Sequence, residues 1–122
     1  MTQRTNISSG VEFESLVGYS RAVRIGPVIA VAGTTGAGDG IAAQARDALR
    51  RIDIALRDAG AELTDVVRTR IYVTDITRWR DVAEVHAEVF GDIRPVATMV
   101  EVRALISPEL LVEIEVDAYI GG

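Results

Sequence analysis

The sequence predicts an α+β domain in which two helices cover one face of a β-sheet. Two segments, residues 41–59 and 77–90, repeat apolar residues at helical spacing. The segment 111–119 alternates instead, with apolar side chains on one side and acidic ones on the other. An amphipathic helix must bury its apolar face, and the apolar side of a sheet offers the surface for it. Both helices should therefore lie on the same face, which leaves the opposite face uncovered.

The chain is expected to form one domain over residues 1–122. It has 48% hydrophobic and 25% charged residues, which is ordinary for a globular protein of this size. Its net charge of −5 argues against a broad nucleic-acid surface, which needs clustered Lys and Arg. The longest apolar run, residues 27–32, is too short to span a membrane. No apolar stretch of a signal peptide follows the N-terminus, so we expect a cytoplasmic protein.

The residue types exclude several kinds of chemistry. The chain has no cysteine, which rules out disulfides, thiolate nucleophiles and Cys-ligated metals. Its one histidine, His86, lies at the border of an apolar helical stripe, so we expect a packed or half-exposed residue rather than a base. We therefore expect no metal and no cofactor.

The first third of the chain predicts a hairpin followed by a loop. Residues 1–16 are polar and form an arm or a first irregular strand, and residues 19–25 alternate weakly. A turn at 26–27 leads into the buried-type strand 28–32. The glycine-rich segment 33–40 superficially resembles a phosphate-binding loop. It lacks the Lys-Ser/Thr pair of a P-loop and the glycine spacing of a dinucleotide site, so nucleotide binding is not expected.

The first helix is predicted over Ile41–Ala59, with Asp39 capping its start and Gly60 ending it. Its apolar stripe consists of Ile41, Ala45, Ala48, Leu49, Ile52, Leu56 and Ala59.

A strand is predicted next, over Val66–Thr74, with two distinct faces. The more apolar face carries Val67, Thr69, Ile71 and Val73. The other face carries Val66, Arg68, Arg70 and Tyr72.

The second helix should begin at Thr77 as N-cap, run through Phe90 and stop at Gly91. Its apolar stripe is Trp79, Val82, Ala83, His86, Val89 and Phe90. Two further strands, Thr98–Val102 and Leu111–Tyr119, complete the sheet.

The last strand predicts which face of the sheet is covered. Its apolar residues, which can pack under the helices, are Val112, Ile114, Val116 and Ala118. Its acidic residues, which face the other way, are Glu113, Glu115 and Asp117. Arg68 and Arg70 could pair with this acidic row. The uncovered face is either solvated or packed against other subunits, and we expect the second because a two-layer domain this small buries its core marginally.

The C-terminal quarter resembles the signature of the RidA/YjgF family. Residues 95–102 (PVATMVEV) and 112–115 (VEIE) follow the family pattern, and the resemblance extends over nearly the whole chain. It implies a chorismate-mutase-like fold and a homotrimer with a small-molecule ligand at each subunit interface. Well-known members of the family hydrolyse reactive enamines and imines without a cofactor.

The resemblance also implies which residues form the cleft. Glu113 occupies the position of the family's water-handling glutamate, and Gly33 that of a glycine where the backbone approaches the ligand. Tyr19 matches a tyrosine that reaches the site of a neighbouring subunit. The alternative for Glu113 is a structural ion pair with Arg68 or Arg70.

Two departures from the family pattern bear on activity. Ala97 stands where active members carry an arginine that clamps the substrate carboxylate, and Met99 stands where many carry cysteine. A guanidinium binds a carboxylate in a bidentate fork that no small residue can replace. Losing such a pair costs on the order of 2–5 kcal/mol of binding free energy. Arg21 and Arg70 are the best candidates for a relocated arginine.

Three functions follow from these observations. The first is cofactor-free hydrolysis of an enamine or imine, on an altered substrate, with Glu113 orienting water. The second is a non-catalytic trimer that binds a small metabolite or regulates a partner, which the alanine at position 97 favours. The third, least supported, is RNA cleavage, which has been attributed to some relatives; the acidic pI of about 4.8 and the single histidine weigh against it.

Overall fold

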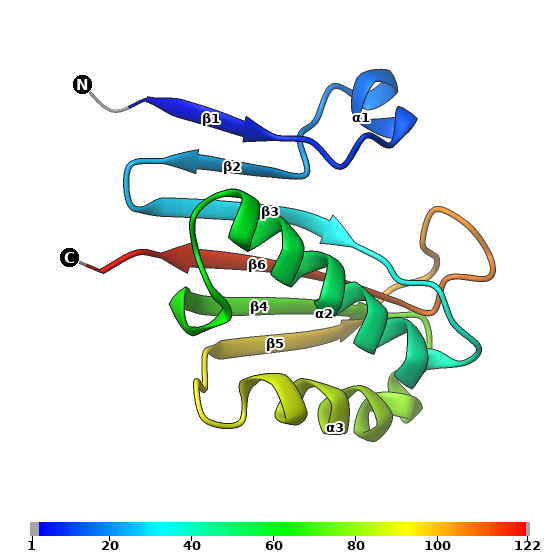
Figure 1. The fold of residues 1–122 in the computed structure, drawn as a ribbon. Coiled ribbons are helices and arrows are strands. Elements are labelled where there is room, and N and C mark those ends of the chain that lie inside the picture. Colours follow the sequence, from blue (N-terminus) through cyan, green and yellow to red (C-terminus); the bar gives the residue numbers. More distant parts are fainter. Residues whose placement is uncertain (1–2, 122) are drawn as a thin grey trace.

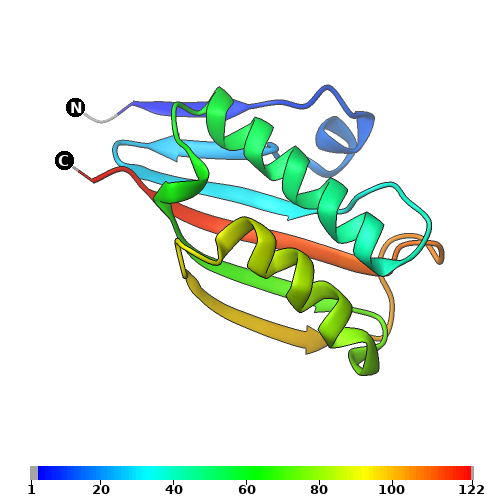
Figure 2. The same cartoon turned by 60° about the horizontal axis from the view of Figure 1, so that its bottom comes forward.

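Two long helices lie across one face of a six-stranded sheet in the computed structural model, which describes residues 3–121 (Figures 1 and 2). The elements are β1 (Arg4–Ile7), α1 (Glu12–Val17), β2 (Ala22–Ile25), β3 (Val28–Thr34), α2 (Ile41–Asp58), β4 (Val66–Val73), α3 (Trp79–Phe90), β5 (Val96–Glu101) and β6 (Val112–Tyr119). Short 3-10 turns at Leu63–Asp65 and Ile76–Arg78 precede β4 and α3. The predicted α+β architecture is confirmed.

The strands are arranged in the order β1-β2-β3-β6-β4-β5. The predicted hairpin is β2–β3, whose register places Ile25 opposite Val28. The C-terminal strand β6 lies between β3 and β4, antiparallel to both. Only β4 and β5 are parallel among the pairs described, and α3 makes the crossover that a parallel pair requires.

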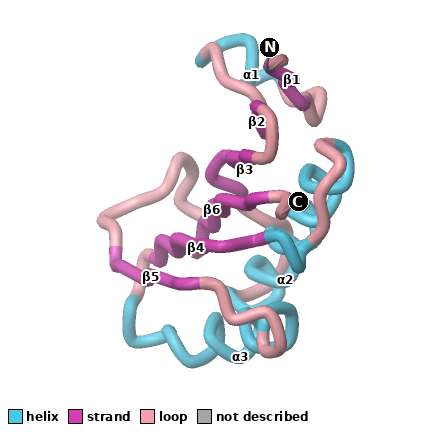
Figure 3. The backbone as a smooth tube through the Cα atoms, turned by 90° about the vertical axis from the view of Figure 1, so that its left-hand side faces the viewer, coloured by secondary structure: helices cyan, strands magenta, loops and turns pink. Residues whose placement is uncertain are grey.

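The core lies between the helices and the sheet. Every residue of the predicted α2 stripe is buried, and the four apolar residues of β6 are at most 2% exposed. Burying a large apolar side chain stabilises a fold by about 1.5–3 kcal/mol, so these residues fix the face on which the helices pack. Figure 3 shows α2 and α3 on one side of the row of strands, with the other side uncovered.

The helix starts differ from the prediction. The residue before α2 is Gly40, not Asp39, and no side chain caps the helix. Gly40 has φ 94°, which glycine adopts readily and other residues do not, so the helix begins only after it. Thr77 is not the N-cap of α3: it lies in the 3-10 turn before the helix, whose own cap is Asp75, with its carboxylate accepting from the Thr77 backbone N–H. The residue before α3 is Arg78, and no side chain caps that helix. Gly60, with φ 84°, ends α2 as predicted.

Two predicted positions are wrong: Val67 does not lie on the buried face of β4, and Trp79 is not buried under α3. Val66 is buried and Val67 is exposed, because β4 has one extra residue opposite β6 between Val66 and Arg68, and such a bulge reverses the alternation. Trp79 is the first residue of α3 and is 43% exposed, with Arg80 stacked on its ring. The buried residues of α3 are Val82, Val85 and Phe90, of which Val85 was not in the predicted stripe.

The N-terminal segment contains more structure than predicted. The irregular strand is the short β1, and the short helix α1 after it was not expected. Its apolar side chains are exposed, so they form no buried stripe. β5 also begins two residues earlier than predicted, at Val96.

No helix within residues 3–121 has both the length and the apolar character needed to cross a membrane.

Candidate functional site

A bulge in β3 creates the site's central feature. Val31 of β3 pairs with Val116 of β6, but the next pair is Thr34 with Ile114, so β3 has one extra residue here. A bulge re-aims the local backbone and side chains, and such bulges occur often beside functional sites. Gly33 lies in this extra segment, on the strand next to Glu113.

The side chain of Glu113 lies against the backbone of Gly33. A Cβ atom added at Gly33 would lie 2.9 Å from the Glu113 Cδ atom and closer still to one carboxylate oxygen. Glycine is therefore required here for contact rather than for backbone conformation. The close approach that the sequence predicted for Gly33 is made by the chain's own carboxylate.

Arg21, the residue just before β2, binds the same bulge. Its Nη atoms donate to Thr34 Oγ1 at 2.9 Å and to the Gly33 carbonyl at 3.1 Å. The Thr34 hydroxyl donates in turn to the Ala32 carbonyl at 2.7 Å. The guanidinium also lies 5.7 Å from the centre of the Tyr19 ring. Arg21 thus connects Tyr19 to the bulge.

The electrostatics of Glu113 suit proton transfer. Burial raises the pKa of the Glu113 carboxyl, and the neighbouring Glu115 raises it further, while Arg21 opposes both effects. A carboxyl whose pKa is raised toward neutrality can accept and return a proton at physiological pH. A carboxyl whose pKa is shifted by burial and by neighbouring charges is a feature that many functional sites share.

The rest of the acidic row forms ion pairs and hydrogen bonds with β4. Arg70 contacts Asp117 at 3.2 Å and Glu115 at 3.9 Å, and Arg68 contacts Asp117 at 3.9 Å. The Tyr72 hydroxyl donates to Glu115, which raises the pKa of Tyr72. The alternative in which Glu113 pairs with Arg68 or Arg70 is therefore wrong, because their partners are the other two acids.

Ala97 and Met99 lie elsewhere in the chain. They pair with Thr69 and Ile71 of β4, which are buried under the helices, so their side chains are on the helix side of β5. Glu113 is two strands away, and neighbouring strands are about 4.8 Å apart. It also points to the opposite face of the sheet.

The grouping of site residues thus differs from the one that the resemblance implied. Tyr19, Arg21, Gly33 and Glu113 lie together in one chain, whereas Ala97 and Met99 are separate from them. Arg70 lies beside this group and forms an ion pair with Asp117.

His86 occupies a half-buried position in α3. Its Nε2 atom lies 2.9 Å from Thr69 Oγ1, and its ring stacks on Phe90 with centroids 4.8 Å apart. Burial lowers the pKa of His86, so the ring is neutral near pH 7. Its placement as a half-exposed packed residue is confirmed, and Thr69 links it to the strand position beside Ala97.

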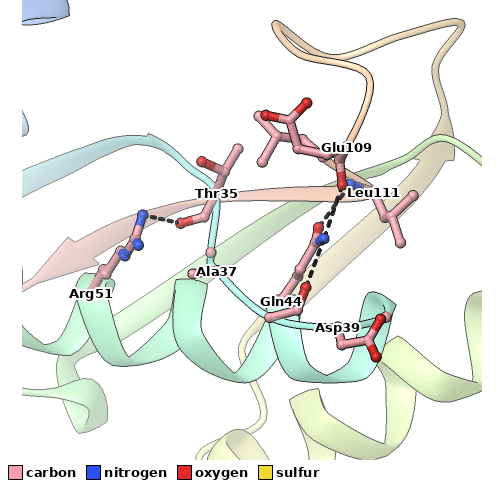
Figure 4. A pocket seen from close by; sticks show the side chains of 11 residues that line it. Thr35, Ala37, Asp39, Gln44, Arg51, Glu109 and Leu111 are labelled. Atoms are coloured by element: carbon pink, nitrogen blue, oxygen red, sulfur yellow. Dashed lines mark hydrogen bonds between the residues drawn. The ribbon is translucent and has the colours of Figure 1, made fainter.

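Sequence reasoning missed a second feature, a hollow of about 560 Å³ beside the start of α2 (Figure 4). Gln44 closes its floor: the side-chain amide donates to the Gly38 and Glu109 carbonyls and accepts from the Leu111 N–H at 2.8 Å. Arg51 donates to the Thr35 carbonyl at the rim. These polar groups are hydrogen-bonded to one another, and Gln44 thereby joins the loop that contains Gly38 to the loop that contains Glu109. The signal in the sequence was a glutamine on the inner side of a helix.

Within residues 3–121, no three acidic or histidine side chains gather closely enough to hold a metal ion.

Comparisons with known proteins agree with the fold. The family model described as Endoribonuclease L-PSP matches residues 9–120. The crystal structure of Rv2704 from Mycobacterium tuberculosis, a member of the YjgF/YER057c/UK114 family, is similar with a TM-score of 0.96 and 75% identity, covering 97% of this chain and 100% of that one.

Two curated relatives support the same assignment. An uncharacterized Streptomyces coelicolor protein, SCO2049, is 33% identical over 124 residues, which is 95% of this chain and 92% of its own length. A RutC family protein of Pyrococcus abyssi is 36% identical over 110 residues, 83% of this chain and 85% of its own.

Proposed function

The chain belongs to the Endoribonuclease L-PSP family, with relatives named for YjgF and RutC, and from that premise we propose that it hydrolyses small imines or enamines without a cofactor. The reaction adds water to a C=N bond and releases a carbonyl compound and ammonia.

The observation that carries this proposal is the carboxyl of Glu113, held against Gly33 with a raised pKa. In the reaction, Glu113 removes a proton from water as the water oxygen attacks the carbon of the protonated imine, which gives a neutral carbinolamine. Glu113 then returns this proton to the amino nitrogen, ammonia leaves as the hydroxyl oxygen forms the C=O bond, and the hydroxyl proton passes to the carboxylate and on to solvent. General acid-base catalysis of this kind contributes about 10²–10⁴-fold to a rate.

We place the substrate between copies of the chain, in a homotrimer. The uncovered face of the sheet and the separation of Glu113 from Ala97 support this arrangement, because one chain offers only one wall of a cleft. The resemblance to the RidA/YjgF family supports a trimer.

A coupled assay tests the proposal. Purified protein is added to a dehydratase that generates 2-aminoacrylate, and to oxidases that generate imines, while the loss of the intermediate is followed. We expect acceleration over the spontaneous rate for at least one of these intermediates, and its loss in Glu113→Gln. If no imine or enamine decays faster with the wild-type protein, the hydrolytic function is wrong.

The second candidate is a non-catalytic trimer that binds a metabolite or regulates a partner. Ala97 favours it, since no cation stands at that position of β5. A metabolite that binds the folded trimer raises its melting temperature by mass action. A thermal-shift screen of small keto and hydroxy acids without any hit counts against this candidate.

RNA cleavage, which the family name suggests, has the least support. The ring nitrogen Nε2 of His86 is already bound to Thr69, and the net charge is −5. Nuclease signal that survives stringent repurification and falls in His86→Gln would favour this third function.

A further inference from the structure

Arg21 binds three consecutive residues in the bulged part of β3. Its backbone carbonyl accepts from the Ala32 N–H at 2.9 Å. Its two Nη atoms donate to the Gly33 carbonyl at 3.1 Å and to Thr34 Oγ1 at 2.9 Å. The backbone N–H of Arg21 donates to the Ile7 carbonyl of β1 at 2.8 Å, which holds Arg21 itself in place. One residue therefore holds the whole stretch in which the pairing of β3 with β6 is irregular.

These hydrogen bonds bear on Glu113 because its carboxylate lies against the Gly33 backbone. The space between them does not admit even one methyl group, so a shift of that backbone changes where the carboxylate can lie. Arg21 binds Gly33 through its carbonyl oxygen. Arg21 is therefore connected to Glu113 through one hydrogen bond and one van der Waals contact.

Arg21 also places a positive charge near Glu113. The two acceptors of its Nη atoms, a carbonyl and a hydroxyl, are neutral, so they do not cancel the charge of the guanidinium. The carboxylate of Glu14 in α1 is near enough to interact with this charge, but it is bound by the N–H and the hydroxyl of Ser9. The charge of Arg21 favours the ionised form of the Glu113 carboxyl and lowers its pKa.

The other charged and titratable groups around Glu113 lie on its own strand and on β4. Glu115, the next residue on the same face of β6, favours the protonated form of Glu113. Tyr72 pairs with Glu113 across the strands, and its hydroxyl donates to Glu115. Arg70, two residues before Tyr72, contacts Glu115 and the acidic residue beyond it. Arg21 is thus the cation on the β3 side of Glu113, where these other groups cannot replace its charge.

The placement of Arg21 is not the one that stability alone would favour. Its Nε atom is buried and has no hydrogen-bond partner among residues 3–121. A buried donor that stays unsatisfied is costly. A neutral side-chain amide has two N–H donors and could bind the bulge without a charge to desolvate. The positive charge at this position therefore needs a reason other than the hydrogen bonds.

We infer that Arg21 is a positioning residue of the proposed hydrolysis, an inference that rests on that function: it holds Gly33 in place against the Glu113 carboxylate and keeps a positive charge near it. Glu113 must be ionised to remove a proton from the attacking water. Arg21 favours that starting state, and the fixed bulge keeps the carboxylate in one position while the proton arrives and leaves. In this role Arg21 contacts neither the water nor the imine.

Two substitutions separate the charge of Arg21 from its hydrogen bonds. Arg21→Gln keeps two N–H donors and removes the charge, whereas Arg21→Lys keeps the charge and removes the planar fork. Arg24→Gln is the matched control, because Arg24 lies on the same hairpin and also donates to carbonyls, those of Gly26 and Ala59. Arg24 pairs with the buried Ile29, so it lies on the helix side of the sheet, away from Glu113.

For each variant the pKa of Glu113 is measured by NMR titration. The values of kcat and KM are measured against pH on the imine or enamine of the coupled assay that the wild type hydrolyses fastest. We expect Arg21→Gln to raise the pKa of Glu113, and to move the acidic limb of kcat/KM to higher pH, by about half a pH unit or more. Arg21→Lys should keep the limb near its wild-type position and lower kcat roughly tenfold or more, because the carboxylate is less well placed. Arg24→Gln should change neither quantity.

A wild-type pKa of Glu113 together with a wild-type acidic limb in Arg21→Gln overturns the inference and leaves the hydrolytic function standing, even if the variant is slower. A rise in KM alone would show that Arg21 binds the substrate directly, which overturns the inference as well. If Arg21→Gln does not fold, Arg21→Lys decides: an unchanged kcat overturns the inference, and a lowered kcat with an unchanged limb supports it. If the wild type accelerates the loss of no imine or enamine, the proposed function fails and the inference fails with it.

Discussion

The carboxylate of Glu113 lies against Gly33, at the one place where β3 has an extra residue opposite β6. The contact couples a bulge in one strand to an ionisable group in the next. It also means that the smallest possible side-chain addition, one methyl group, acts directly on the proposed base.

Gly33→Ala should displace the carboxylate with little loss of stability. The backbone of Gly33 is not in the left-handed region, so alanine fits it. The clash is with the end of a flexible side chain, and rotating such a side chain away costs about 0.5–1.5 kcal/mol. We expect a large loss of hydrolysis and a lower pKa of Glu113, measured by NMR titration.

The matched control for that substitution is Gly33→Ala in a Glu113→Ala background, where no carboxylate remains to clash. There the extra methyl should be close to neutral for stability. A Gly33→Ala variant that keeps the wild-type pKa of Glu113 would contradict the contact.

The raised pKa of Glu113 predicts a pH-dependent stability difference. Below the unfolded value of 4.5 the carboxyl is protonated in both states, and it contributes no charge penalty. As pH rises through the interval between 4.5 and the higher folded pKa, the unfolded chain ionises first, so the wild type loses stability. A tenfold difference in proton affinity between the folded and unfolded chains corresponds to about 1.4 kcal/mol of unfolding free energy.

The Glu113→Gln variant has no carboxyl group to ionise at this position, so it does not lose stability in this way as pH rises. Denaturant unfolding should show the variant gaining on the wild type as pH rises above 4.5, with a plateau above the folded pKa. A difference that stays flat with pH would show that the carboxyl is not destabilised by burial.

The sheet and its covered face could be predicted because they are set by long periodic patterns. Eight residues of β6 alternate without interruption, and α2 keeps its stripe for eighteen residues. The bulges could not be predicted, since one extra residue depends on the partner strand and not on local sequence. That is why Val66 lies on the buried face of β4, where the sequence predicted Val67. Asp39 failed as a cap for a local reason, the backbone angle of Gly40.

The sequence could name candidate residues for the site but not how they group in space. The resemblance identified Gly33 and Glu113, and the structure brings them into contact. It did not reveal that Arg21 is bound to the bulge, because its partners, Thr34 and the Gly33 carbonyl, become neighbours only through strand pairing. Likewise, the face on which Ala97 lies depends on its pairing with Thr69.

Val100→Glu should dissociate the proposed trimer. Val100 pairs with Tyr72 on the uncovered face and is 42% exposed in the single chain. A carboxylate buried there against other subunits would have no partner, which costs several kcal/mol. Sedimentation should show monomers where the wild type is trimeric. The control is Ile54→Glu, a similarly exposed apolar residue on the outer side of α2, which should remain trimeric.

If Val100→Glu remains assembled, this face is not the interface. A monomeric wild type would remove the trimer itself, and with it the cleft between chains.

His86 predicts sensitivity to acid. Its pKa is lowered by burial, so below 6.5 the unfolded chain binds a proton that the folded chain resists, and stability falls as pH decreases. His86→Gln keeps a polar group near Thr69 but does not titrate. The variant should gain stability relative to the wild type when pH is lowered from neutrality toward about 5. An unchanged difference over that range would mean that His86 is protonated as easily in the folded state.

Ala97→Arg should create a binding group for small carboxylates. The new guanidinium would lie on the edge strand β5 beside Thr69, at an exposed position, so the fold should tolerate it within about 0.5 kcal/mol. Its planar guanidinium could bind a carboxylate through two parallel N–H groups. We expect small keto acids to bind roughly tenfold or more tightly than to the wild type, by calorimetry. Ala97→Lys, which carries the charge without the planar fork, should recover only part of this gain. If Ala97→Arg folds and assembles normally but binds keto acids no better, position 97 does not face the ligand, and the second wall of the cleft must be sought elsewhere on the chain.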